Sequence, residues 1–141
     1  MPENATLSSG MVEKFHDAEL LSFETIREER FVKLNFILQS SEICQIQLHN
    51  IAAFRAVDII HQNVISRLLV STIFEFSPEG TVHFIKWTNS LTDNSSLIND
   101  QQIARYVDRL TRREIMLFVL EPSWGAEIAA LCESISISSQ A

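Results

Sequence analysis

The strongest constraint on the fold is a strict alternation of apolar and polar side chains with a period of two residues. Cys44, Ile46 and Leu48 alternate with three polar residues, and similar alternation runs through residues 31–38 and 64–76. A β-strand with one buried face and one solvated face requires this period. The chain is therefore expected to form a compact, β-rich domain in which neighbouring strands run antiparallel.

Short polar segments between the alternating stretches indicate turns. Residues 27–30 are a run of charges, and residues 40–42 are Ser-Ser-Glu. The clearest signal is Ser77-Pro78-Glu79-Gly80, because proline pre-sets φ and glycine tolerates positive φ. This turn predicts one long hairpin over residues 64–87, in which residues 81–87 form the second strand.

One main helix is expected over residues 100–113. Asn99 is a good N-cap, and Gln102 three residues later completes the pattern of a capping box. The apolar residues of this segment recur at the spacing of one helix face. They are Ile103, Tyr106, Val107 and Leu110. Two further strands are expected after the helix, over residues 115–120 and 128–137.

These elements predict an α+β fold, a mainly antiparallel sheet of about six or seven strands with one main helix packed on one face. Residues 51–63 show no clear period and are expected to be irregular. Residues 1–11 are polar and aperiodic, which is typical of a flexible N-terminal tail. Residues 12–141 are then expected to form a single α+β domain.

The balance of charge narrows the class of partner. Eleven Lys and Arg residues against eighteen Asp and Glu residues give a net charge of −7. A protein that binds DNA or RNA must neutralise phosphates with Lys and Arg, so this balance argues against nucleic acid. An acidic surface instead suits a basic protein partner through electrostatic steering and complementarity. A simple role in keeping the protein soluble is the alternative.

Cysteine usage and hydropathy indicate a location. Cys44 and Cys132 lie far apart in apolar segments, which fits two buried thiols in a reducing compartment better than a disulfide. The first fourteen residues lack the apolar core of a signal peptide. No apolar run approaches the roughly 18–20 residues that span a bilayer. We therefore expect a cytoplasmic protein that does not enter a membrane.

The sequence contains no recognisable catalytic or metal-binding pattern. The four histidines never recur at i, i+4 and none lies beside a cysteine, so the familiar zinc spacings are absent. The three glycines are isolated, so no glycine-rich loop is available to hold a phosphate. Buried thiols are usually inert. We therefore expect no enzyme, no cofactor and no metal site.

A few acidic and aromatic side chains are candidates for contact with a partner. Trp124 stands between Pro122 and Gly125 in a segment that reads as a loop, where an aromatic ring can be exposed. Acidic residues without a cation nearby in the sequence flank this loop or lie at the tip of the expected hairpin. They are Glu121, Glu127, Glu75 and Glu79. The arginines of the expected helix are interpreted as a solvated face, paired in part with neighbouring acids.

Two polar pairs stand where strands are expected to begin. His16-Asp17 precedes the first strand, and Gln62-Asn63 precedes the strand that starts at Val64. The preferred interpretation of His16-Asp17 is structural, with the Asp17 carboxylate accepting hydrogen bonds from the turn backbone. The functional alternative for this pair is a general base or a surface contact.

The segments around these pairs resemble a known family. Phe15-His16-Asp17-Ala18-Glu19-Leu20 opens a strand, and Arg55-Ala56-Val57-Asp58 leads into Gln62-Asn63-Val64-Ile65. This combination, between residues 15 and 76, resembles the small cytoplasmic immunity proteins of bacterial polymorphic-toxin systems, including contact-dependent growth inhibition. The resemblance implies a single small domain that binds and blocks a cognate toxin domain and has no catalytic residues. It also implies that both polar pairs define the fold.

The resemblance and the charge together lead to an expected function. We expect an immunity protein that neutralises its toxin by occluding the toxin's active site, and a basic nuclease is a toxin class that suits the acidic composition. The alternative is a small-ligand-binding or enzymatic domain that uses a cavity between helix and sheet, with His16 or His61 as the polar group. The sequence carries no signal for the oligomeric state.

Overall fold

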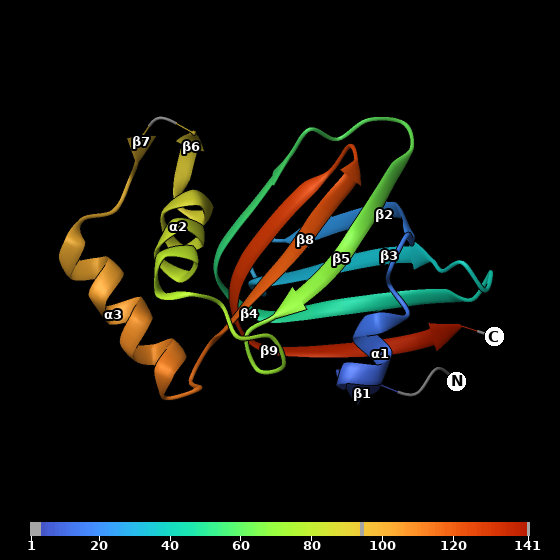
Figure 1. The fold of residues 1–141 in the computed structure, drawn as a ribbon, viewed down its shortest axis with the longest axis horizontal. Helices are drawn as coiled ribbons and strands as arrows, with labels where there is room; N and C mark the ends of the chain where they lie inside the picture. The colour runs from blue at the N-terminus through green and yellow to red at the C-terminus, as the bar shows by residue number, and fades with distance from the viewer. Residues whose placement is uncertain (1–3, 94, 141) are drawn as a thin grey trace.

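The chain forms a small antiparallel barrel with helices outside its wall (Figure 1). The computed structural model describes residues 4–93 and 95–140, and in these the chain forms nine strands and three helices. In chain order the elements are β1 (Asn4–Thr6), α1 (Ser9–Glu13), β2 (Glu19–Ile26), β3 (Phe31–Ile37), β4 (Ile43–Val57), β5 (Asn63–Val70), α2 (Pro78–Thr88), β6 (Ser90–Thr92), β7 (Ser95–Ser96), α3 (Asp100–Thr111), β8 (Met116–Trp124) and β9 (Glu127–Gln140).

Six strands close into the barrel. Their order is β9-β4-β3-β2-β5-β8, and β8 pairs again with β9, which completes the ring. β1 extends this sheet by pairing with the last part of β9, and each strand pair in the described residues is antiparallel. The expectation of a mainly antiparallel sheet of six or seven strands is therefore confirmed. Closure pairs strand edges that an open sheet would leave free.

The interior of the barrel is filled by the apolar faces that the alternation predicted. The buried residues of β3 and β4 are Val32, Leu34, Phe36, Cys44, Ile46 and Leu48. The register pairs Leu34 with Ile46 and Phe36 with Cys44, so the two apolar faces point the same way. Each large apolar side chain buried in this manner contributes about 1.5–3 kcal/mol to the free energy of folding. The alternation in these two strands is therefore confirmed as a core pattern.

The segment around α1 adds an aromatic ring to the barrel core. Phe15 follows α1 and is completely buried, with 0% of its surface exposed. Its ring meets that of Phe36 edge to face, with centroids 5.1 Å apart. Residues 1–11, expected to be a flexible tail, include β1 and the start of α1, while residues 1–3 lie outside the described part of the chain.

A second core lies outside the barrel wall, under the two longer helices. α2 and α3 cover one side of the barrel (Figure 1). The side chains that the helices and the wall contribute to this core include Ile85, Trp87, Ile103, Leu117, Val119, Ala129 and Leu131. β8 and β9 are also buried on their inner face, where Phe118, Leu120 and Ala130 join the barrel core. Burial on both faces explains why these strands read as continuous apolar runs.

The hairpin expected over residues 64–87 is wrong, because its second half is the helix α2. The Oγ of Ser77 caps this helix by accepting a hydrogen bond from the backbone N–H of Gly80 at 3.0 Å. Pro78 is the first helical residue, where its missing N–H costs nothing. Ser-Pro-Glu-Gly is thus a helix start as well as a turn signal. Glu79 lies in the first turn of α2 and not at a hairpin tip.

Two strands run further than expected. β4 continues through residues 51–57, which were expected to be irregular, because a bulge between Ile51 and Ala53 interrupts the alternation while the pairing with β9 goes on. β8 continues to Trp124, although residues 121–125 were read as a break. Pro122 is tolerated within this strand because the pairing with β5 is irregular at that point.

α3 confirms the helix expected from the capping signal. The side chain of Asn99 accepts a hydrogen bond from the N–H of Gln102, and Gln102 Oε1 accepts one from the N–H of Asn99, both at 2.9 Å. The expectation of one main helix is corrected, because α2 has 11 residues and α3 has 12. Within the described residues, no helix is both long enough and apolar enough to cross a bilayer.

Truncation of Phe15 tests whether the residues around α1 belong to the core. We expect Phe15→Ala to lower the free energy of unfolding by about 3–5 kcal/mol, because it deletes a buried aromatic ring and leaves a cavity. Leu21→Ala is the control, since Leu21 is exposed and its truncation should change this free energy by less than about 0.5 kcal/mol. Urea denaturation followed by tryptophan fluorescence measures both variants. Equal losses would contradict the burial of Phe15.

Candidate functional site

The surface that best fits a binding site lies where the β4–β5 loop meets the β8–β9 turn. Both connections reach the same end of the barrel (Figure 1). Three large apolar side chains there are exposed, Ile59 by 46%, Ile60 by 43% and Trp124 by 64%. We name this the Trp124 surface and define it as Asp58, Ile59, Ile60, Trp124 and Glu127. Exposed apolar groups gathered in one place are typical of contact surfaces.

Asn63 locks the loop to the turn. Its side chain is buried. Its Oδ1 accepts hydrogen bonds from the backbone N–H groups of Ile60 and Ala126, each at 3.0 Å, and its Nδ2 donates to the carbonyl of Ile60 at 2.7 Å. One side chain therefore joins two connections that are 63 positions apart in the sequence. This contact gives the Gln62-Asn63 pair a structural role through Asn63, while Gln62 is exposed.

Gly125 allows the turn to pass close to Asn63. Its φ is +89°, a backbone conformation that favours glycine. A Cβ at this position would lie 2.5 Å from Asn63 Oδ1 and 2.8 Å from Ile60 Cγ1. Trp124 directly precedes Gly125, so its ring is presented from a turn whose geometry is fixed by buried contacts. An exposed aromatic side chain on a fixed turn is a suitable anchor for a partner.

Glu127 begins β9 beside this turn and is half-buried. Burial raises the pKa of its carboxyl group above the ordinary value, and the carboxylates of Asp58 and Asp93 raise it further. The charges of His83 and Arg55 lower this pKa but do not offset the rise. The negative charge of the Glu127 carboxylate is therefore unfavourable in the folded protein. Groups perturbed in this way cluster at functional sites.

Arg55 brings positive charge to this end of the molecule but is already engaged. Its guanidinium group stacks on the Trp87 ring, 4.4 Å from the centroid, and donates to the Trp87 carbonyl at 3.3 Å. It also pairs with Asp93 at 3.2 Å, and the same Asp93 oxygen accepts a hydrogen bond from Trp87 Nε1 at 3.2 Å. Asp58 and Glu127 form no ion pair in the described residues, so they can meet a cation from outside.

The other acidic residues named from the sequence are paired or lie elsewhere. Glu121 forms a two-pronged ion pair with Arg67 of β5, with N–O distances of 3.0 and 2.9 Å, and this contact lowers the pKa of Glu121. Glu75 lies in the loop before α2 and Glu79 in its first turn. This loop is at the opposite end of the barrel from the β8–β9 turn (Figure 1). The structure therefore groups Trp124 with Glu127 but not with Glu75 or Glu79.

His16 and Asp17 lie at the entry to β2. His16 Nδ1 and Asp17 Oδ2 are 3.2 Å apart, and Gln39 Nε2 donates to Asp17 Oδ2 at 3.5 Å. Asp17 has a positive φ of 60°, and its backbone N–H donates to the carbonyl of Ile65. Its carboxylate is exposed and accepts no backbone hydrogen bond in the described residues. The backbone contact of Asp17 is therefore made by its N–H, while its carboxylate contacts the side chains of His16 and Gln39 and not the turn backbone as the sequence indicated.

The cysteine and histidine side chains that could act in catalysis or metal binding are either unreactive or dispersed. Cys44 and Cys132 are buried and unpaired, and burial raises the pKa of Cys44 to about 11 and that of Cys132 to about 12. Both thiols therefore stay protonated at neutral pH. His16 and His61, the polar groups of the enzymatic alternative, are exposed on different connections. In the part of the chain that the structure describes, no three His, Cys, Asp or Glu side chains gather as metal ligands.

Sequence reasoning found Trp124 and Glu127 but missed their neighbours. Asp58, Ile59 and Ile60 lie in a segment that was read as irregular, and only the barrel brings them to the turn. The available signal was the adjacent pair Ile59-Ile60, since two large apolar residues in a segment without strand or helix period have no predicted place in a core. Nothing in the sequence indicated the contacts that Arg55 makes with Trp87 and Asp93, because these residues belong to elements distant in the sequence.

Truncation of Asn63 tests the lock. We expect Asn63→Ala to lower the free energy of unfolding by at least about 1–3 kcal/mol, because the N–H groups of Ile60 and Ala126 lose their acceptor. Gln62→Ala is the matched control, since the neighbouring side chain is exposed and its loss should change this free energy by less than about 0.5 kcal/mol. Urea denaturation measures both. A similar small effect in the two variants would show that the hydrogen bonds of the Asn63 side chain contribute little to the free energy of unfolding.

Neutralising Glu127 tests its electrostatic environment. A folded-state pKa above the unfolded value means that the charged carboxylate destabilises the fold, so this cost is absent below about pH 4.5 and grows as the pH rises through the folded-state pKa. Glu127→Gln should therefore raise the melting temperature at pH 7.5 and leave it unchanged at pH 4. Glu121→Gln should do the opposite at pH 7.5, because Arg67 lowers the pKa of Glu121. A change of melting temperature in the same direction in both variants at pH 7.5 would contradict the opposite pKa shifts of Glu127 and Glu121.

Comparison with known proteins does not assign the chain to a group. No protein-family model, no curated protein and no solved structure matches it. The Trp124 surface combines an exposed aromatic ring on a locked turn with two carboxylates that form no ion pair in the described residues.

Proposed function

We propose that this chain is an immunity-type inhibitor that binds a basic toxin domain through the Trp124 surface and blocks it stoichiometrically. The observation that carries the proposal is the exposed ring of Trp124 on a locked turn that also leads into the half-buried Glu127 at the start of β9. The resemblance of residues 15–76 to immunity proteins supports the same conclusion. A cytoplasmic location, where such a toxin would act, belongs to this proposal.

The apolar part of the surface supplies the affinity. Binding energy at protein interfaces is concentrated in a few residues, and tryptophan is the most enriched of them. Because Asn63 and Gly125 fix the turn before binding, little ordering entropy is lost when a partner covers Trp124. Ile59 and Ile60 add exposed apolar surface on the adjoining loop, where Ile60 lies against Gly125. A patch of this kind is suited to a protein surface, since it projects outward and does not enclose a small molecule.

The charged part of the surface selects a basic partner. Asp58 and Glu127 form no ion pair with any residue that the structure describes, and the chain carries a net charge of −7. Burial, and after it the charges of Asp58 and Asp93, make the negative charge of Glu127 unfavourable in the free protein. A Lys or Arg from the partner would offset this cost, so binding would gain energy that the free protein does not have. The acidic field also speeds encounter with a basic partner at low ionic strength. A basic nuclease domain meets both conditions.

The proposal requires a basic toxin domain encoded next to this chain, and complex formation with such a domain tests it. The wild-type protein should bind it one to one and abolish its activity. Trp124→Ala should raise the dissociation constant at least about thirtyfold, as expected for a hot spot of 2 kcal/mol or more. Glu127→Lys should raise it as well and flatten its salt dependence. Isothermal titration calorimetry, with melting temperatures measured in parallel, separates lost affinity from lost folding.

Glu79→Lys is the matched control for this experiment, because it makes the same charge change at the opposite end of the barrel. It should leave the dissociation constant within about twofold of the wild type, apart from a small change in association rate. An effect equal to that of Glu127→Lys would move the interface away from the Trp124 surface. A toxin domain that is neither bound nor neutralised would overturn the immunity function itself.

A further inference from the structure

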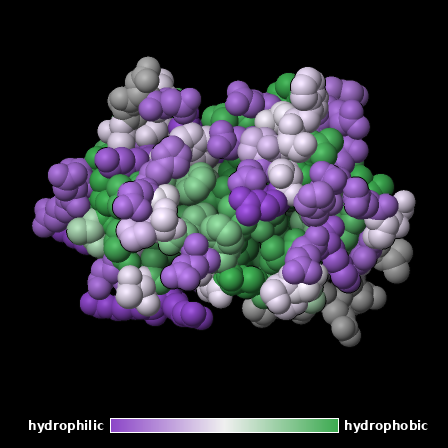
Figure 2. All heavy atoms as spheres, in the orientation of Figure 1, coloured by the Kyte–Doolittle hydropathy of each residue, from purple (hydrophilic) through white to green (hydrophobic). Residues whose placement is uncertain are grey.

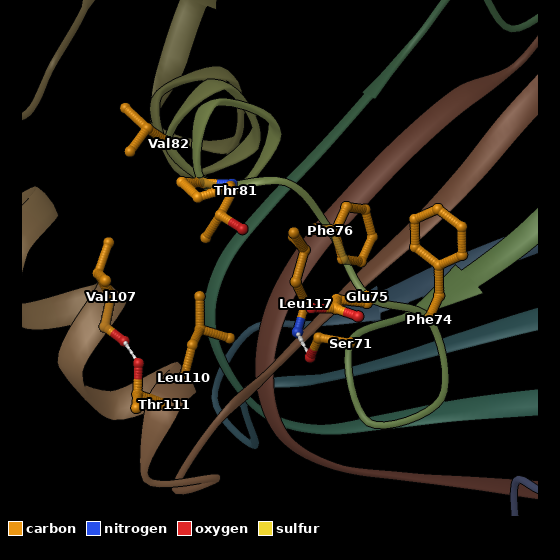
Figure 3. Close-up of a pocket in the computed structure, with 11 residues that line it drawn as sticks. Ser71, Phe74, Glu75, Phe76, Thr81, Val82, Val107, Leu110, Thr111 and Leu117 are labelled. Atoms are coloured by element: carbon orange, nitrogen blue, oxygen red, sulfur yellow. Dashed lines mark hydrogen bonds between the residues drawn. The ribbon is translucent and has the colours of Figure 1, made fainter.

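A groove between the β5–α2 loop, α2 and α3 has the properties of a second binding site (Figure 3). Its volume is about 380 Å³, which lies in the lower part of the range of small-molecule sites. Its apolar walls are Phe74, Phe76, Val82, Val107, Leu110 and Leu117. Figure 2 shows apolar surface between the helical layer and the barrel on this face. An apolar ligand body of modest size fits such walls.

The hydroxyl groups in the groove are committed to the protein itself. Ser71 Oγ accepts a hydrogen bond from the backbone N–H of Leu117 at 2.9 Å. The hydroxyls of Thr81 and Thr111 donate to backbone carbonyls of their own helix region, at 3.0 and 2.9 Å. These side chains therefore present mainly carbon to a ligand. Recognition of a sugar or another polyhydroxylated molecule would need free hydrogen-bonding groups that the groove does not offer.

Glu75 is the exception among the residues that line the groove, because it alone is charged. Its side chain is exposed and forms no hydrogen bond or ion pair with any other described residue. Figure 3 places it beside Phe76, on the loop side of the groove. A ligand whose apolar part lies between the helices can therefore bring a charged end to this carboxylate. Only a positive end is favoured there.

We propose that this groove binds a small hydrophobic amine. Its aliphatic or aromatic body packs between α2, α3 and the two phenylalanines, and its ammonium group pairs with Glu75. The site is independent of the Trp124 surface, which lies at the other end of the barrel (Figure 1). The binding of an amine in this groove can therefore be tested independently of the proposed inhibition of a toxin.

Three probes with the same apolar chain and different head groups test the proposal: n-octylammonium, 1-octanol and octanoate. Binding is followed in the full-length protein at pH 7 by the methyl resonances of Val82, Val107 and Leu110. The shifts should saturate in these methyl groups. Octylammonium should bind about two- to fivefold more tightly than octanol, the range of a partly exposed ion pair. Octanoate should bind more weakly than octanol, because its charge repels Glu75.

Two variants complete the test. Glu75→Gln should bind octylammonium and octanol equally, while Glu79→Gln, the matched control outside the groove lining, should keep the preference for the amine. Val107→Trp should weaken all probes by filling the groove. Equal binding of the three probes to the wild type, or a preference that survives in Glu75→Gln, would overturn the assignment of the ammonium. Shifts confined to other residues, or blocked by self-association of the chain, would overturn the groove as a ligand site.

Discussion

The whole structure depends on β9, which pairs with β4 along most of its length and with a second strand on its other edge in each half. Its first half pairs with β4 and β8, and its second half with β4 and β1. This double pairing closes the barrel and buries the first half of β9 on both faces. Ala129 faces the helical layer and Ala130 faces the barrel core, and both are completely buried. Small side chains are required there, because a larger one would push the helices from the wall or overfill the barrel.

Closure of the barrel also creates the Trp124 surface. β8 and β9 meet at a turn, and the antiparallel pairing of β4 with β9 brings the β4–β5 loop to that turn, where Val57 lies opposite Glu127. Asn63 then fixes the contact with three hydrogen bonds. The same geometry holds Glu127 near other carboxylates, at a cost to the stability of the free protein. Such a conflict between local stability and placement is expected where a surface serves a partner.

Local patterns predicted the parts of this protein that depend on local interactions. The alternation in β3 and β4 and the capping box of α3 each involve residues close in the sequence, and the structure confirms them. The hairpin failed because Ser77-Pro78 begins helices and turns alike, and a bulge hid the second half of β4. The site was found only in part for a different reason. Trp124 stood out by its neighbours Pro122 and Gly125, but the ion pair of Glu121 and the carboxylates around Glu127 depend on strands that meet only in the closed barrel.

The helical layer is fastened to the barrel at the same end as the Trp124 surface, which links the two. Arg55 of the wall stacks on Trp87 of α2 and pairs with Asp93 beyond it. The negative charge of Asp93 also raises the pKa of Glu127. Asp93 is itself held from two sides, by the guanidinium group of Arg55 and by Nε1 of Trp87. Stacking on Trp87 and the bond to its carbonyl hold Arg55 independently of Asp93, so the contact between α2 and the barrel wall does not depend on the ion pair alone.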